Sequence, residues 1–169
     1  VFMNLFHAPV WLLKIARMAR PGDNHTMQQR YDYIAEMTRR IIKRGRVTIK
    51  VTGVEHIPEK DGFMLFPNHQ GLFDVLALFS TCPKALSVVI KKEASGWILV
   101  KQVLGATGSL AMDRKDMKDQ VRIIGEVTRL VKEGRNFVIF AEGHRSRKGN
   151  EILDFKSGTF KSAVKAGCP

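Results

Sequence analysis

His69 and Asp74 are the residues whose types and spacing best suit general-base chemistry. His69 follows a short apolar run and Pro67, and Asp74 lies five positions further on. A neutral imidazole can accept a proton near pH 7 when a carboxylate fixes its tautomer and stabilises the imidazolium that forms. Residues five positions apart on one α-helix point roughly 140° apart, so we expect His69 in a turn and Asp74 in the first turn of the next helix. The alternative is a histidine in a polar loop that lies beside Asp74 by chance.

A second polar stretch follows another short apolar run and contains Glu142, Arg145 and Ser146. Arg145 offers a planar, permanently charged guanidinium, which suits a phosphate better than a point charge does. Ser146 adds a hydroxyl group, and Glu142 adds a hydrogen-bond acceptor. The stretch is therefore a candidate site for a phosphorylated ligand. A solvated basic loop is the alternative, above all for residues 147–148.

Short apolar runs alternate with amphipathic helical patterns along the chain, which predicts an α/β fold with a mostly parallel or mixed sheet between helices. Val47, Ile49 and Val51 alternate with polar residues, as in a half-buried strand. Strands that end in polar loops at one edge of an α/β sheet form a ligand crevice there. The predicted strands cover 47–51, 63–66, 86–90, 109–112 and 137–140, and the predicted helices that follow them cover 73–80, 94–104, 117–131 and 159–166.

Residues 1–46 are predicted to be helical and to precede this sheet. The stretch 1–13 is apolar but interrupted, and it is shorter than the roughly 20 apolar residues of a spanning helix. It could belong to a longer span, lie in the membrane interface or pack on the core. Thr26 and Gln29 predict a capping box at the start of a second helix, whose basic residues lie opposite its apolar ones. Such a helix suits a membrane surface, with a solvated charged face as the alternative.

The chain has 169 residues, of which 44% are hydrophobic, so it can form one domain with a core. Its formal net charge of +12 predicts an anionic partner, such as an anionic bilayer, a phosphorylated small molecule or nucleic acid. Nucleic acid is disfavoured because the aromatic residues are mostly Phe within apolar runs. Cys82 and Cys168 show no metal-binding spacing, so we predict neither a zinc site nor a disulfide framework. Since the chain begins with Val1 and ends in a predicted strand, we expect a fragment of a longer protein.

Three motifs resemble signature blocks of the glycerophospholipid acyltransferase family, which includes the 1-acylglycerol-3-phosphate acyltransferases. The resembling motifs are Asn68-His69 with Asp74, Gly108 leading through an apolar segment to Arg114, and Phe140-x-Glu142-Gly143-x-Arg145-Ser146. They occur in the family's order over residues 68–146. Ala141 stands where the family usually has proline, and His144 stands where it usually has threonine, so the acceptor subclass stays open. A fourth block, a proline-centred strand, would begin near Pro169.

This resemblance implies a glycerol-3-phosphate acyltransferase-like fold and transfer of a fatty acyl group from a thioester to the free hydroxyl of lysophosphatidic acid, giving phosphatidic acid in phospholipid biosynthesis. The acyl donor would be acyl-CoA or acyl carrier protein, and no cofactor or metal is expected. The sequence contains no Gly-x-Ser-x-Gly motif, in keeping with a general-base mechanism that needs no nucleophilic serine. The implied catalytic residues are His69 and Asp74, and the implied substrate-binding residues are Asn68, Arg114, Glu142, Gly143, Arg145 and Ser146.

Two groups of alternatives stay open at this point. The acceptor could instead be glycerol 3-phosphate, another lysophospholipid or a lyso-ornithine lipid. The chain could also be a non-catalytic basic module that binds a membrane or nucleic acid. The family resemblance further implies a membrane-associating segment over residues 1–46, a catalytic domain over 47–169 truncated at its C-terminus, and a place at the cytoplasmic face of a membrane.

Overall fold

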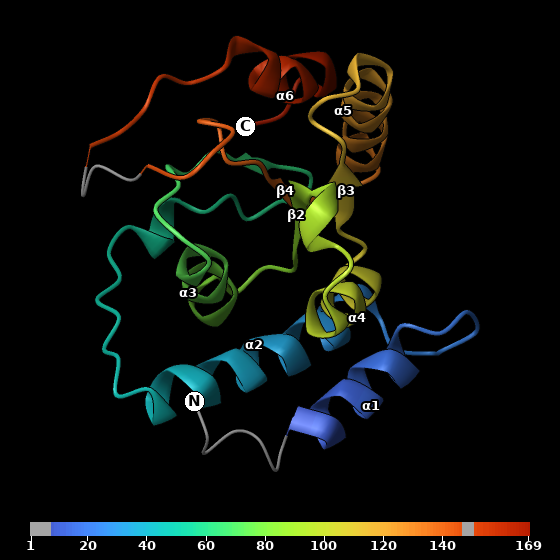
Figure 1. Cartoon of the computed structure of the whole chain (residues 1–169), viewed down its shortest axis with the longest axis vertical. Helices are drawn as coiled ribbons and strands as arrows, with labels where there is room; N and C mark the ends of the chain where they lie inside the picture. The colour runs from blue at the N-terminus through green and yellow to red at the C-terminus, as the bar shows by residue number, and fades with distance from the viewer. Residues whose placement is uncertain (1–7, 147–150) are drawn as a thin grey trace.

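A computed structural model describes residues 8–146 and 151–169, and Figure 1 shows helices gathered around a small central sheet. The predicted α/β fold with an N-terminal helical pair is confirmed. The helices are α1 (Ala8–Met18), α2 (Met27–Arg44), α3 (Phe73–Thr81), α4 (Ile98–Thr107), α5 (Met117–Lys132) and α6 (Lys161–Ala166), and the strands are β1 (Met64–Leu65), β2 (Leu86–Lys91), β3 (Leu110–Met112) and β4 (Asn136–Val138).

The sheet is parallel throughout, with the strand order β1-β4-β2-β3. Met64 lies opposite Phe137 in the β1–β4 pair, and Val89 lies opposite Leu110 in the β2–β3 pair. Parallel strands place all their carboxyl ends at one edge of the sheet, and each connection must return the chain through a helix. The loops that follow β1 and β4 therefore emerge side by side, although these strands are the first and the last along the chain.

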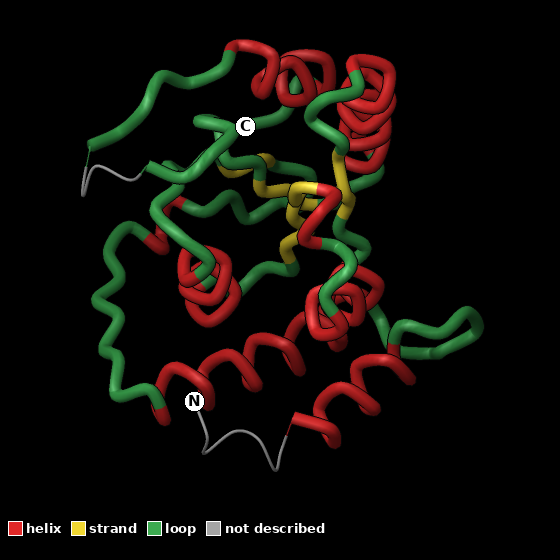
Figure 2. The backbone as a smooth tube through the Cα atoms, viewed as in Figure 1, coloured by secondary structure: helices red, strands yellow, loops and turns green. Residues whose placement is uncertain are grey.

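Helices cover both faces of the sheet, as Figure 2 shows. On one face α1, α2, α3 and α4 pack against the strands, and on the other face α5 and α6 do so. Successive residues of a strand point to opposite faces, so Val138 belongs to the first core and Phe137 to the second. Strands covered in this way need apolar residues at nearly every position, which explains the continuous apolar runs in the sequence.

The helix ends follow the capping signals of the sequence. The Thr26 hydroxyl accepts a hydrogen bond from the Gln29 backbone N–H at 3.2 Å, and the Gln29 side chain accepts one from the Thr26 backbone N–H at 2.8 Å. Asp116 caps α5 by accepting from the Lys118 backbone N–H at 2.9 Å. These contacts satisfy backbone donors that have no partner within the helix, and they fix where α2 and α5 begin.

The predicted strand over residues 47–51 is wrong. This stretch forms no strand with any residue that the structure describes, and Val47 and Val51 are exposed. The Val47 N–H instead donates to the Ile42 carbonyl oxygen at 3.2 Å. An alternating pattern gives a strand only where a neighbouring backbone can accept its hydrogen bonds. The prediction rested on the side-chain pattern alone and assumed that a neighbouring strand would be present to pair with residues 47–51.

The N-terminal helices pack on the same core as the sheet. Trp11 and Ile15 of α1, and Tyr31 and Ile34 of α2, are buried in the cluster that also contains Val88. The apolar face of α2 is therefore occupied by the core, while Arg39, Arg40 and Lys43 are exposed. Arg30 and Arg44 are partly buried. Among residues 8–146 and 151–169, no helix has both the length and the apolar character needed to cross a membrane.

Candidate active site at the carboxyl edge of the sheet

His69 lies in the loop that joins the end of β1 to the start of α3, as its sequence position predicts. Its Nδ1 lies 2.8 Å from Oδ2 of Asp74, which is in the first turn of α3. An ionised carboxylate can only accept hydrogen bonds, so Nδ1 carries the proton and Nε2 keeps the lone pair. The imidazole is 15% exposed, which leaves it partly open to solvent. The pair thus has the orientation that a general base requires.

Asp74 is held by the loop as well as by the imidazole. Its Oδ2 also accepts hydrogen bonds from the backbone N–H groups of Gln70 at 2.7 Å and Gly71 at 2.9 Å. Burial alone would raise the pKa of the Asp74 carboxyl, but the hydrogen bonds from Gly71, His69 and Gln70 outweigh it and lower that pKa below its ordinary value. Asp74 therefore stays ionised at neutral pH and can stabilise a protonated His69.

Phe140, two residues after the end of β4, supports the imidazole. The two rings stack with centroids 4.1 Å apart and an interplanar angle of 27°. Phe140 is itself buried in the core on the α1–α4 face, so its position is fixed by packing. With Asp74 setting the rotation of the ring and Phe140 covering one face, His69 has little freedom to reorient.

Glu142 joins the loops that follow β1 and β4. Its side chain is fully buried, and Oε1 accepts a hydrogen bond from the His69 backbone N–H at 2.7 Å. Its Oε2 accepts from the Leu153 backbone N–H at 3.2 Å. The Ser146 backbone N–H in turn donates to the His69 carbonyl oxygen at 2.8 Å. These hydrogen bonds tie both the N–H and the carbonyl of His69 to the Glu142–Ser146 loop.

Arg145 lies in the same loop and is exposed. It directly precedes Ser146, whose backbone N–H donates to the His69 carbonyl oxygen. Gly143 has a φ of +73°, and the Lys156 side chain lies against it, so a side chain at position 143 would be both strained and crowded. The Lys156 backbone N–H also donates to the Ala141 carbonyl oxygen at 2.9 Å. Cationic side chains are thus available on the loop that holds His69 in place.

Residues 48–169 match the family model described as Acyltransferase. The chain belongs to the acyltransferase family. It is 30% identical to a 1-acyl-sn-glycerol-3-phosphate acyltransferase of Borreliella burgdorferi over 121 residues, which are 72% of this chain and 48% of that protein. It is 35% identical to the Escherichia coli protein of the same name over 104 residues, 60% of this chain and 42% of that one. The chain therefore spans about half the length of the curated relatives it matches.

A solved structure shares the fold of this acyltransferase. The crystal structure of the 1-acyl-sn-glycerophosphate (LPA) acyltransferase PlsC from Thermotoga maritima has a TM-score of 0.70 and 24% sequence identity. The match covers 97% of this chain and 64% of that chain. The recognition of the family from its motifs is confirmed.

The acyltransferase structure brings most of the predicted site residues to one part of the sheet edge. Asn68 is exposed beside His69, and Ser146 is buried beside the His69 carbonyl oxygen. Arg114 lies further from the Glu142–Ser146 loop than His69 does, because Arg114 follows β3 and that loop follows β4. Two strand intervals of about 4.8 Å each separate β3 from β4. Burial lowers the pKa of Arg114, and the charge of Glu93 opposes this shift.

Three contributors to the acyltransferase site were not predicted from its sequence. They are the Phe140 ring, the backbone N–H groups of Gln70 and Gly71, and the Leu153 backbone N–H. Phe140 was predicted as the last residue of a strand over 137–140, and its ring lies in the core. No signal in the sequence marked its contact with His69, because that contact depends on β1 and β4 being neighbours in the sheet.

Two further observations concern a possible metal site and a groove. Within residues 8–146 and 151–169, His, Cys, Asp and Glu form no group of three suited to holding a metal ion. A groove of about 560 Å³ is lined by the end of α2, residues 46–49 and the end of α3. Because Asp74 is at the start of α3 and this groove is at its end, the groove does not contain the dyad.

Proposed function

We propose that the full protein transfers a fatty acyl group from an acyl thioester to the free hydroxyl of lysophosphatidic acid, which gives phosphatidic acid. The observation that carries this proposal is the His69–Asp74 dyad at the carboxyl edge, tied to the Glu142–Ser146 loop. Membership of the acyltransferase family and the names of the relatives support the same reaction.

The proposed reaction begins at His69. Its Nε2 removes the proton of the acceptor hydroxyl while the hydroxyl oxygen attacks the thioester carbonyl carbon. The resulting tetrahedral intermediate expels the thiolate, which takes the proton from the imidazolium. Asp74 stabilises the imidazolium between these steps, since its lowered pKa keeps it anionic.

We assign substrate binding to Arg145, with Arg114 further along the same edge. The guanidinium of Arg145 would clamp the phosphate of the acceptor and hold the neighbouring hydroxyl near Nε2. Positioning of this kind supplies a large part of a catalytic effect without chemistry of its own. In this proposal Glu142 acts by holding the backbone of His69, because both of its carboxylate oxygens accept from backbone N–H groups.

The proposal includes a membrane-associated enzyme at the cytoplasmic face, with acyl-CoA or acyl carrier protein as the donor. Lysophosphatidic acid resides in or on a bilayer, and the net charge of +12 suits an anionic surface. The domain arrangement that we propose is a membrane-associating segment over residues 1–46, followed by the catalytic domain over residues 47–169.

The test is an acceptor panel with the full-length protein. Lysophosphatidic acid, glycerol 3-phosphate, lysophosphatidylethanolamine and a lyso-ornithine lipid are each supplied with acyl-CoA or acyl-acyl carrier protein that carries a radiolabelled acyl group. We expect the highest kcat/KM with lysophosphatidic acid. A higher kcat/KM with another acceptor would overturn the substrate assignment, and absence of acyl transfer to every acceptor would overturn the proposed activity.

A further inference from the structure

Large apolar side chains are exposed where three helices begin. These helices are α3, α4 and α5, each of which follows a strand of the sheet. The residues concerned are between 40% and 73% exposed, which is unusual for a run that includes aromatic and branched aliphatic side chains. We call these six residues the apolar rim: Leu72, Phe73, Trp97, Ile98, Leu99 and Met117.

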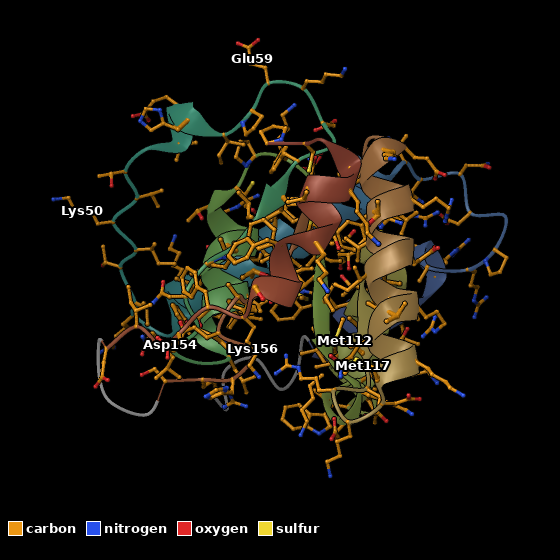
Figure 3. All side chains as sticks on the ribbon, turned by 90° about the horizontal axis from the view of Figure 1, so that it is seen from above. Lys50, Glu59, Met112, Met117, Asp154 and Lys156 are labelled. Atoms are coloured by element: carbon orange, nitrogen blue, oxygen red, sulfur yellow. The ribbon has the colours of Figure 1, made fainter. Side chains whose placement is uncertain are left out.

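The apolar rim lies at the edge of the sheet that holds His69. A helix that follows a parallel strand begins near the carboxyl end of that strand, and β1, β2 and β3 together span the whole width of the sheet. Figure 3 shows Met117 close to Met112, the last residue of β3, on the same side of the molecule as Lys156. Lys156 contacts Gly143 in the loop that holds His69, so the rim and the site share one side.

The start of α4 is the most prominent part of the rim. Trp97 is the N-cap residue and has an extended backbone, and Ile98 and Leu99, the first two helical residues, point about 100° apart. The three exposed side chains therefore do not form one flat face. The other end of α4 is fixed, because Ala106 is buried and Gly105 packs against Ala19 of the α1 end. A rigid protein partner would cover one side of such a projection, whereas fluid acyl chains can surround it. The geometry therefore favours lipid over an acidic carrier protein as the occupant.

Exposed cationic side chains accompany the rim. Lys101 lies one turn after Trp97, and Lys115 and Lys118 flank Met117. Lys91 and Lys92 precede α4 but form ion pairs with Glu93 at 3.0 Å and Asp113 at 3.4 Å. Apolar side chains that enter the acyl region and lysines that reach the phosphate layer are the two components of interfacial binding. Tryptophan is also enriched at the level of the headgroups.

We propose that the apolar rim inserts into an anionic bilayer and presents the carboxyl edge of the sheet, with His69, to the lipid surface. This inference rests on the proposed function, since it places the catalytic base where a lysolipid acceptor resides. It adds the starts of α3, α4 and α5 to the membrane-associating segment proposed over residues 1–46. Trp11, Ile15 and Tyr31 of that segment pack on the core, whereas Val10 and Leu13 of α1 are exposed.

The test measures binding of the full-length protein to vesicles of phosphatidylcholine and phosphatidylglycerol. Ile98→Ser should weaken partitioning about tenfold, because the loss of one inserted aliphatic side chain has roughly that effect. The matched control is Val164→Ser on α6, whose side chain is equally exposed but lies outside the rim, and it should bind like the wild type. Brominated lipid should quench the fluorescence of Trp97 in the wild type. This quenched component should be absent from the Trp97→Phe variant.

Two acceptors separate this inference from the proposed function. Ile98→Ser should keep wild-type turnover of a short-chain lysophosphatidic acid in free solution. With vesicle-embedded lysophosphatidic acid at subsaturating vesicle concentration, its turnover should fall by the same factor of about ten as its partitioning. Absence of turnover by the wild-type protein with both acceptors would overturn the proposed function. The proposal for the rim would be overturned if Ile98→Ser bound vesicles as well as the wild type does. It would also be overturned if Ile98→Ser lost only its binding to acyl carrier protein, or if only Val10→Ser and Leu13→Ser on α1 weakened vesicle binding.

Discussion

The carboxylate of Glu142 holds the backbone N–H of His69 at 2.7 Å, although the two residues are 73 positions apart in the chain. Because Glu142 is fully buried, this contact is protected from water. The contact joins the loops of two neighbouring parallel strands, β1 and β4. Glu142 therefore determines where the backbone of the proposed general base lies.

Glu142→Gln tests this positioning role. The amide keeps one acceptor oxygen but turns an N–H group toward the second backbone donor, so one of the two loop contacts is lost. We expect kcat to fall about 10- to 100-fold, as small misplacements of a catalytic group do, while KM for lysophosphatidic acid stays unchanged. Steady-state kinetics with the full-length protein measure both constants.

Glu59→Gln is the matched control, because Glu59 is exposed and lies away from Lys156 and Met117 in Figure 3. It should leave both constants at their wild-type values. A rise in KM for Glu142→Gln with kcat retained would instead assign Glu142 to substrate binding.

Asp74→Asn should make stability less dependent on pH in the acid range. The lowered pKa of Asp74 means that its stabilising contribution is present above the unfolded pKa of about 3.9 and is lost as pH falls through the folded value. The wild type should exceed the variant in unfolding free energy by about 1 to 3 kcal/mol at pH 7, and this difference should shrink below about pH 4. Urea denaturation at several pH values measures it, and a difference that stays constant would contradict the assigned shift.

Arg145→Ala should chiefly raise KM for the phosphorylated acceptor. The loss of a charged hydrogen-bonding partner weakens phosphate binding by about 10- to 100-fold, whereas the dyad of His69 and Asp74 stays intact. Arg145→Lys keeps the charge but loses the planar fork, so its KM should lie between those of the wild type and Arg145→Ala. Equal KM values for all three proteins would exclude Arg145 from the phosphate site.

Gly108→Ala should destabilise the fold through Arg135. Gly108 has a φ of +54°, and an added methyl group would overlap the guanidinium of Arg135, which donates to Ser87 and to the Thr107 and Gly108 carbonyls. We expect a loss of about 2 to 4 kcal/mol in the free energy of unfolding. In an Arg135→Ala background the same change should cost only about 1 to 2 kcal/mol, the backbone term. Chemical denaturation of the wild type, the two single variants and the double variant gives the four free energies of unfolding. If the two single losses add up to the loss in the double variant, the overlap with Arg135 is contradicted.

The sequence predicted the elements of the fold well where a local pattern determines the structure. The capping box of Thr26 and Gln29 depends on neighbouring residues only, and it forms. The continuous apolar run that became β2 also identified a strand covered on both faces. The stretch 47–51 failed because a strand also needs a paired backbone, which its own residues do not specify.

The candidate site was predictable in its residues but not in its connections. The five-residue spacing of His69 and Asp74 led directly to the observed pair, since a turn followed by a helix brings them together. The stacking of Phe140 on His69 and the Glu142 contact depend on β1 and β4 being neighbours. Strand order is a long-range property, so no local pattern could reveal these two contacts.

The most direct test of the central claim, that His69 is the general base, is single-turnover acyl transfer by the full-length His69→Ala variant. With acyl thioester and lysophosphatidic acid both saturating, the rate should fall about 10²- to 10⁴-fold, the usual contribution of a general base. Lysophosphatidic acid should bind as tightly as it does to the wild type, because the phosphate contacts assigned to Arg145 are untouched. A single-turnover rate equal to that of the wild type would contradict the account.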